Sequence, residues 1–247
     1  MITIHYLEEI GKDELENAVF ITGFQGFGMV GYLASRHIAY ELRLQRIGFI
    51  KTRYMPETTF YNKERGISYP FELYYGRVGK TKLVVLVNHA IPLERERTAY
   101  AEFIAKWVKE NNLAKAILIG GLDPAIRESE DEKYRWIPIS GYKADLDAPI
   151  LSDKYVVGPL ALTIMFMNAY RVPGIAIFAY TELYRPDPRA SAVAVEAIAK
   201  LLGITIDTRK LIEEAAAIEA IEEERKKLLK TIEGEVRSEK PRYTMHV

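Results

Sequence analysis

The sequence contains no cysteine, and this absence excludes disulfide bonds, thiolate metal sites and a cysteine nucleophile. It also favours a reducing compartment, so we expect a cytoplasmic protein. An excess of charge of one sign is absent too, because 34 Lys and Arg residues balance 34 Asp and Glu residues. No global field attracts nucleic acid or an anionic membrane surface, and neither is expected as a partner.

Long apolar runs and a signal peptide are also absent. The first residues, MITIHYLEEIGKDELEN, alternate apolar and charged side chains and lack a basic segment followed by an apolar core. The longest apolar stretch, Val156 to Ala169, is shorter than the roughly 20 residues that a bilayer crossing needs. With 247 residues, 49% of them hydrophobic and 28% charged, the sequence is typical of a globular protein with a sizeable core.

Strand and helix patterns alternate along most of the sequence. Short apolar runs, typical of strands that helices cover on both faces, predict one central, mostly parallel sheet. These runs are Ala18 to Thr22, Arg46 to Ile50, Leu83 to Val87, Ala116 to Ile119 and Ile175 to Ala179. The helical patterns are Met29 to Leu42, Arg97 to Asn111, Pro159 to Arg171 and Pro188 to Leu202. The alternation predicts a three-layer α/β/α domain over residues 1–207.

An antiparallel hairpin is predicted within this domain, where Phe71 to Arg77 is followed by Gly79 and the next apolar run. The stretch from Tyr54 to Tyr75 is rich in aromatic residues. Two interpretations of these aromatic residues stay open, because they can pack an edge hairpin or form a contact surface.

One long amphipathic helix is predicted over residues 208–234. Its apolar positions recur at spacings of three, four and seven, and include Leu211, Ile218, Ile221, Leu228 and Ile232. The helix can lie wholly on its own domain or contact another subunit, and these five residues are therefore candidates for partner binding. Residues 235–247 have little apolar content before their end and are predicted to form a flexible tail.

A glycine-rich turn follows the first predicted buried strand. Gly26, Gly28 and Gly31 match the G-x-G-x-x-G pattern of dinucleotide-binding turns, and a predicted helix follows. The acidic residue that such sites carry about 20 positions later is missing, and Phe24 and Phe27 stand within the turn. A structural turn, a site for a small anionic ligand and a dinucleotide site stay open, and no cofactor is assigned.

Polar residues also follow other predicted strands at the same edge of the sheet. His89, Asp123 and Glu182 could carry out proton transfer there, and His89 and Asp123 are further candidates for ligand binding. Each also has a structural interpretation, as a loop histidine or a turn-capping carboxylate. No spacing of His, Asp or Glu matches a metal site, and neither G-x-S-x-G nor a Walker loop occurs. We therefore expect no metal and no catalytic site.

Several motifs resemble those of the proteasome assembly chaperone family. The glycine turn GFQGFGMVG matches the family pattern, as do Gly120-Gly121 after a strand, Val157 to Leu160 and Arg185 to Ala190 at helix starts. The resemblance covers about residues 15–225. It implies a Rossmann-like three-layer domain that assembles with itself or with related chains and, in archaeal members, binds proteasome α-subunits.

The resemblance also implies a docking tail. Family members that engage the proteasome α-ring end in a hydrophobic-Tyr-any tripeptide, whose terminal carboxylate lies near a lysine. This sequence ends Met245-His246-Val247, so the hydrophobic residue and the carboxylate match, whereas His246 replaces the tyrosine.

The expected function is that of a non-enzymatic, homo-oligomeric assembly chaperone that binds proteasome α-subunits or another assembly-chaperone homologue. The alternative is an enzyme or sensor that binds a nucleotide-like or phosphorylated small molecule at the glycine turn.

Overall fold

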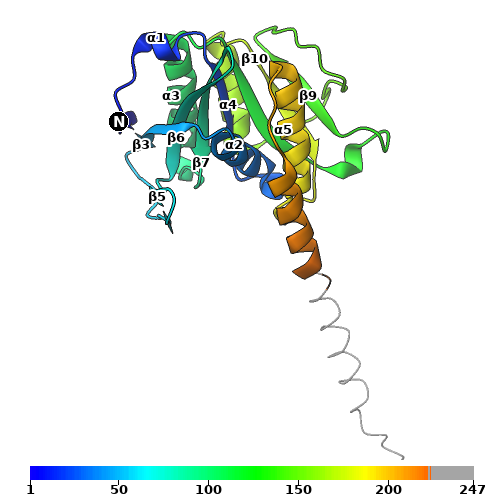
Figure 1. Cartoon of the computed structure of the whole chain (residues 1–247). Helices are drawn as coiled ribbons and strands as arrows, with labels where there is room; N and C mark the ends of the chain where they lie inside the picture. The colour runs from blue at the N-terminus through cyan, green and yellow to red at the C-terminus, as the bar shows by residue number, and fades with distance from the viewer. Residues whose placement is uncertain (222, 224–247) are drawn as a thin grey trace, which may run out of the picture.

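An eight-stranded sheet forms the centre of the protein (Figure 1). The computed structural model describes residues 1–221 and residue 223. The strand order is β1-β3-β6-β7-β2-β8-β10-β9. Four neighbouring strands in its centre are parallel, namely β7 (Thr81–Asn88), β2 (Val19–Gly23), β8 (Lys115–Leu122) and β10 (Gly174–Tyr180).

The outer strands of this sheet pair antiparallel. They are β1 (Thr3–Tyr6), β3 (Gln45–Lys51), β6 (Phe71–Val78) and β9 (Tyr134–Ile139). The predicted parallel arrangement is thus confirmed for the central strands, and the sheet as a whole is mixed. In the predicted hairpin, which is confirmed, β6 pairs antiparallel with β7 through the turn at Gly79. This pairing joins the antiparallel strands to the parallel centre of the sheet. An apolar run reveals that a strand is buried but not its direction.

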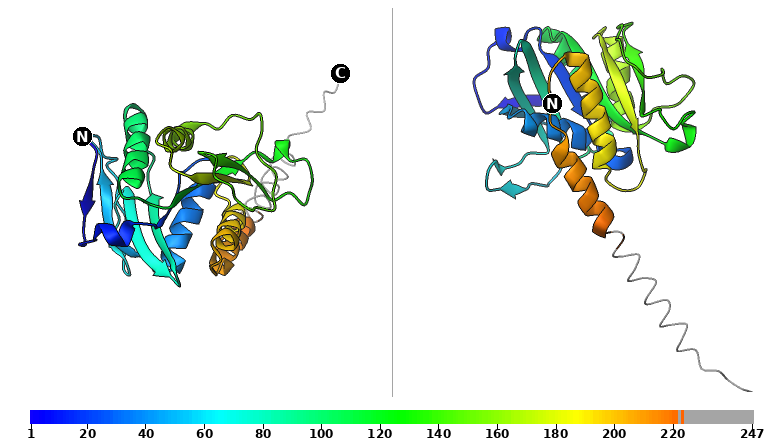
Figure 2. Two further views of the ribbon diagram at one scale, coloured as in Figure 1. Left: turned by 90° about the horizontal axis from the view of Figure 1, so that it is seen from above. Right: turned by 45° about the vertical axis from the view of Figure 1, so that its right-hand side comes forward.

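Two layers of helices cover the sheet (Figure 2). On one face lie α2 (Val30–Glu41) and α5 (Pro188–Leu202), and on the other lie α3 (Arg97–Glu110) and α4 (Gly158–Ala169). Side chains alternate between two cores along the strands, so that Phe20 packs toward α3 whereas Val19 and Ile21 pack toward α2. The predicted three-layer α/β/α arrangement is confirmed, and the finer expectation of a Rossmann-like domain stays a prediction.

Shorter elements complete the fold. They are the helix α1 (Lys12–Leu15) and the single-turn helices η1 (Phe27–Met29), η2 (Glu94–Glu96) and η3 (Pro124–Ile126). A small hairpin of β4 (Tyr61–Asn62) and β5 (Gly66–Ile67) stands outside the main sheet (Figure 1). We call residues 58–69 the arm. Phe60 and Tyr61 are exposed on it, and whether these aromatic residues contact a partner stays open.

The C-terminal helix begins at residue 209 and continues through residue 221 (Figure 1). It leaves the molecule on the side from which the arm projects. Its predicted extent to residue 234 and the division into residues 1–207, 208–234 and 235–247 stay predictions, because most of the last two segments lies outside the described residues. In the part of the chain that the structure describes, no helix combines the length and apolar character of a membrane span.

Candidate functional site

The glycine turn is closed by packing against neighbouring strands. Gly28 has a φ of 58°, and a Cβ added there would lie 1.9 Å from Oγ1 of Thr181. A Cβ on Gly31 would lie 2.4 Å from the carbonyl oxygen of Ile119 on β8. Gly26 differs, because no atom lies within 4 Å of the Cβ position. Two of the three glycines therefore allow close backbone approach within the fold, which favours a structural turn over a ligand site.

The carboxylates near this turn cap local structure. Asp123 accepts a hydrogen bond from the backbone N of Ala125 at 2.8 Å, and so caps η3. Asp187 accepts from the backbone N of Ala190 and from Oγ1 of Thr181, both at 2.9 Å, at the start of α5. These bonds correspond to the capping interpretation of Asp123.

A second polar network fixes the end of β7 against β2. Asn88, which is completely buried, donates from Nδ2 to Oγ1 of Thr22 at 3.0 Å and to the carbonyl oxygen of Gly23 at 2.9 Å. Its Oδ1 accepts a hydrogen bond of 2.7 Å from the hydroxyl of Tyr100 on α3. The Asn88 amide therefore joins a strand end, the glycine turn and a helix.

His89, the residue after β7, joins a buried charge network centred on Glu72. The Glu72 side chain is 0% exposed. It accepts four hydrogen bonds, from Nη1 of Arg46 at 2.6 Å, Oη of Tyr74 at 2.5 Å, the backbone N of Tyr69 at 3.0 Å and Nε2 of His89 at 2.9 Å. On the other side of the imidazole, Nδ1 lies 3.2 Å from the hydroxyl of Tyr32 on α2.

The network holds Glu72 in its ionised form. Burial by itself would raise the pKa of Glu72, but the hydrogen bonds from His89, Tyr74 and the Tyr69 backbone outweigh burial and lower the pKa to about 2. Burial, together with the charge of Glu72, raises the pKa of Tyr74 far above its usual value. Because Nε2 of His89 donates to the carboxylate, Nδ1 of a neutral imidazole accepts the proton of the Tyr32 hydroxyl.

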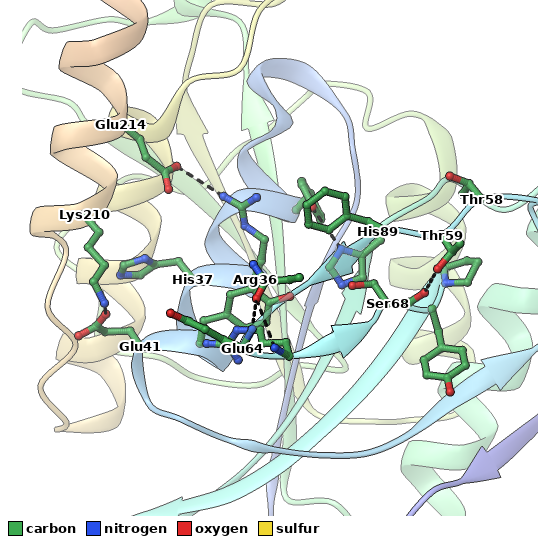
Figure 3. Close-up of a pocket in the computed structure, with 17 residues that line it drawn as sticks. Arg36, His37, Glu41, Thr58, Thr59, Glu64, Ser68, His89, Lys210 and Glu214 are labelled. Carbon is green, nitrogen blue, oxygen red and sulfur yellow. Dashed lines mark hydrogen bonds and ion pairs between the residues drawn. The ribbon is translucent and has the colours of Figure 1, made fainter.

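A pocket of about 470 Å³ opens beside His89 (Figure 3). We call it the His89 pocket. Its walls come from α2, the arm and the start of the C-terminal helix, and include Tyr32, Arg36, Tyr40, Glu41, Glu64, Arg65, Ser68, Lys210 and Glu214. Among the residues predicted for ligand binding, His89 lines this pocket, whereas Gly26, Gly28, Gly31 and Asp123 do not.

The first turns of the C-terminal helix pack on their own domain. Leu211 is 1% exposed and belongs to the core between the sheet and α2 and α5. Ile218 is half-buried, and Ile221 is 67% exposed. The other residues predicted for partner binding, Leu228, Ile232, Met245, His246 and Val247, lie outside the described residues. Contact between this helix and another subunit stays a prediction, and Leu211 is already occupied within its own chain.

Within residues 209–221, three ion pairs connect the same helix to the domain. Lys210 lies 2.8 Å from Glu41 and Glu214 lies 3.4 Å from Arg36, both on α2. A third pair joins Glu219 to Arg189 on α5 at 3.0 Å. Figure 3 shows the first two pairs at one wall of the His89 pocket. Because the pairs are partly exposed, they orient the helix more than they stabilise it.

Metal ligation finds no support in this part of the chain. Within residues 1–221 and residue 223, no three His, Asp or Glu side chains form a group that could hold a metal ion.

Residues 20–226 match the model of the PAC2 family. The chain belongs to the PAC2 family. This assignment confirms the family resemblance of the glycine turn and of the other motifs. The PAC2 protein is 29% identical, over 220 residues, to an uncharacterised protein of Methanocaldococcus jannaschii, and the match covers 85% of this chain and 86% of that protein.

Two solved structures of Pyrococcus furiosus proteins resemble the PAC2 protein along nearly its whole length. PbaB, described as an archaeal proteasome activator, has a TM-score of 0.74 at 20% identity, with 91% of this chain and 98% of that chain covered. PbaA, described as an archaeal homolog of proteasome-assembly chaperone, has a TM-score of 0.72 at 23% identity, with 96% and 95% covered. At these identities the likeness establishes the fold.

Glu72 and Arg46 of the PAC2 protein were not among the site residues predicted from the sequence. Arg46 begins a run that was predicted as a strand of the central sheet, and Glu72 lies in the predicted hairpin. An acidic residue inside FELYY and a basic residue at the start of RIGFI were nevertheless visible signals. Opposite charges in two otherwise apolar strand segments indicate a buried ion pair when the strands are neighbours.

Proposed function

We propose that this PAC2 protein is a non-enzymatic, homo-oligomeric assembly chaperone of the cytoplasm that binds proteasome α-subunits or another PAC2 protein. The observation that carries the proposal is the whole-chain likeness to PbaA and PbaB. One of these is described as a homolog of proteasome-assembly chaperone and the other as a proteasome activator. Family membership over residues 20–226 supports the same role.

The geometry of the glycine turn supports a binding protein rather than an enzyme that uses this turn. Thr181 and β8 fill the space that larger residues in place of Gly28 and Gly31 would need. Asp123 and Asp187 are engaged as caps. These contacts assign structural roles to the motif that otherwise favours a nucleotide-like ligand.

The end of the C-terminal helix is the proposed partner-binding region. Ile221 exposes an apolar side chain at the point where the helix leaves the domain. Leu228 and Ile232 continue its apolar stripe in the sequence, and Met245-His246-Val247 supplies the candidate docking tail. Exposed apolar side chains on a projecting helix are typical anchors of helix-in-groove binding.

The proposal is tested by mixing the full chain with proteasome α-subunits and measuring masses in solution by light scattering. We expect the chain alone to exceed the mass of a monomer and to form a heavier complex with α-subunits. Ile221→Glu should weaken the complex. Met165→Glu is the matched control, because Met165 is a similarly exposed apolar residue (63% exposed) on α4.

Two results would count against the proposal. A monomeric chain would refute the homo-oligomer. Failure to bind α-subunits, whether added before or after ring assembly, would leave another PAC2 protein as the partner to be tested. Deletion of residues 245–247 separates the tail from the helix, because binding that survives the deletion and is lost in Ile221→Glu assigns the contact to the helix.

A further inference from the structure

The His89 pocket has the size of a small-molecule site. Its volume of about 470 Å³ lies in the range, roughly 300 to 1,000 Å³, of pockets that bind small ligands. Polar groups of three separate elements converge on it (Figure 3). The glycine turn, in contrast, contributes no glycine of its motif to this pocket.

One wall of the pocket is a single face of α2. Tyr32, Arg36 and Tyr40 are four positions apart along this helix, so their side chains lie above one another. The guanidinium carbon of Arg36 lies 5.3 Å from the centre of the Tyr32 ring. From the arm, Arg65 places its guanidinium carbon 3.6 Å from the centre of the Tyr40 ring.

Stacking leaves the hydrogen-bonding edges of these arginines available. A guanidinium that lies on a ring face keeps its N–H groups in the plane of the group, directed past the ring. In the described part of the chain, the Arg65 side chain makes no hydrogen bond or ion pair and is only half-buried. Among the same described residues, the Arg36 guanidinium pairs with one carboxylate, that of Glu214, at 3.4 Å. The N–H donors of the Arg65 guanidinium are therefore available to a ligand, and so are the N–H donors of Arg36 that do not contact Glu214.

The remaining charges of the pocket are largely matched. Lys210 pairs with Glu41, and Glu214 with Arg36. Glu64 is exposed beside Arg65 and makes no side-chain hydrogen bond or ion pair among the described residues. A ligand anion next to Arg65 would therefore meet a guanidinium that has no ion-pair partner among the described residues. The exposed carboxylate of Glu64 would repel this anion.

Hydrogen bonds hold the base of the pocket and the arm. His89 is fixed on one side by the buried carboxylate of Glu72 and on the other by the Tyr32 hydroxyl. The arm is closed on itself through the hydroxyl of Thr59, which donates to the carbonyl oxygen of Ser68 at 2.7 Å. A pre-positioned base and wall reduce the entropy that a ligand must lose on binding.

We propose that the His89 pocket binds a small molecule through a carboxylate or phosphate group, which the stacked guanidiniums of Arg65 and Arg36 receive. Planar arginine forks bind both oxyanions through charge-assisted hydrogen bonds. This site lies apart from the glycine turn and goes beyond the proposed chaperone role. A ligand held by Arg65 and Arg36 would connect the arm to α2, beside the wall that Lys210 and Glu214 form.

The test is a titration of the full chain with sodium phosphate and, separately, with sodium succinate, against sodium chloride at equal ionic strength. We expect a saturable rise in melting temperature with at least one oxyanion. A response to phosphate alone identifies a phosphate ester as the ligand class. A response to succinate alone identifies an organic acid.

Three substitutions on the arm test where the oxyanion binds. Arg65→Gln should weaken binding about tenfold, which corresponds to the loss of a charge-assisted hydrogen bond. Lys63→Gln is the matched control, because it removes the same charge from an exposed residue of the arm that does not line the pocket. Glu64→Gln should strengthen binding.

The proposal is overturned if neither oxyanion gives a saturable shift, or if Arg65→Gln and Lys63→Gln weaken binding equally. Melting temperatures of the variants without added oxyanion show whether each still folds. The result is independent of proteasome binding, so either proposal can fail without the other.

Discussion

Nε2 of His89, just after β7, lies 2.9 Å from Oε2 of Glu72 on the neighbouring strand β6. The carboxylate is fully buried, and three further donors complete its hydrogen bonding. This contact ties the base of the His89 pocket to the sheet. A buried charge of this kind is strongly destabilising when one partner is removed.

Replacement of Glu72 by Gln should lower the free energy of unfolding by about 3 kcal/mol at neutral pH, because Arg46 loses its buried counter-ion. Chemical denaturation measures this change. Glu110→Gln, which removes an exposed carboxylate 3.9 Å from Lys106, is the control and should change stability by less than about 0.5 kcal/mol.

Acid should weaken the protein through the same carboxylate. The pKa of Glu72 is lowered to about 2 from the ordinary 4.5, so its stabilisation is complete above the unfolded-state pKa and is lost as the pH falls from about 4.5 toward 2. The free energy of unfolding, measured at several pH values across this window, should fall less steeply with decreasing pH in Glu72→Gln than in the wild type. Equal slopes would show that Glu72 titrates normally.

Replacement of Gly28 by Ala should destabilise the fold by about 2 to 4 kcal/mol, because the added Cβ meets Thr181 and the residue has a positive φ. Gly26→Ala provides the comparison. Gly26 has open space around its Cβ position and a negative φ of −121°, so its replacement should cost less than about 1 kcal/mol. Equal stability of the two variants in urea would contradict the close contact between the turn and Thr181.

Loss of the Tyr100 hydroxyl should cost about 1 to 2 kcal/mol, because Tyr100→Phe leaves the buried Oδ1 of Asn88 without a donor. Tyr155, which is 99% exposed, allows the same chemical change without a buried partner, and Tyr155→Phe should have no measurable effect. Thermal or chemical unfolding of both variants makes this comparison. A neutral Tyr100→Phe would mean that the Asn88 amide does not need this bond.

Docking of the C-terminal helix should depend on Leu211 rather than on its ion pairs. Leu211→Ala should cost about 2 to 4 kcal/mol, whereas Ile212→Ala, at a position that is 37% exposed, should cost less than about 1 kcal/mol. Glu219→Gln should change stability by less than about 0.5 kcal/mol.

Amide hydrogen exchange over residues 209–221 measures the docking directly. Faster exchange in Leu211→Ala than in Glu219→Gln is expected. The reverse order would show that charge holds the helix in place.

The central strands could be predicted from the sequence, because burial on both faces leaves continuous apolar runs such as Leu83 to Val87. The large helices could be predicted from their helical patterns between these runs. The edge strand β1 left no such signal, since three of its four residues are exposed. In β9, Arg135 interrupts the apolar pattern, and its burial depends on the ion pair with Glu132. Such strands are recognisable only when their partners are known.

The candidate site could be predicted only in part. The position of His89 followed from strand order, because the ends of parallel strands meet at one edge. Its partners Glu72 and Tyr32 come from a hairpin and from a helix, and the pocket also needs Arg65 and Lys210. No local pattern relates residues this far apart in sequence, so their meeting is a property of the tertiary fold.

The order of strands in the sheet also has a consequence for biosynthesis. Strand β2 is the second strand to be synthesised. Its neighbours in the sheet come much later, because β7 begins at Thr81 and β8 begins at Lys115. Until then, both edges of this apolar strand lack their partners. A nascent chain that ends before β8 therefore exposes an apolar strand with an unpaired edge, which is prone to aggregation. We expect this strand to need protection by another protein, or rapid synthesis of β8, before the sheet can form.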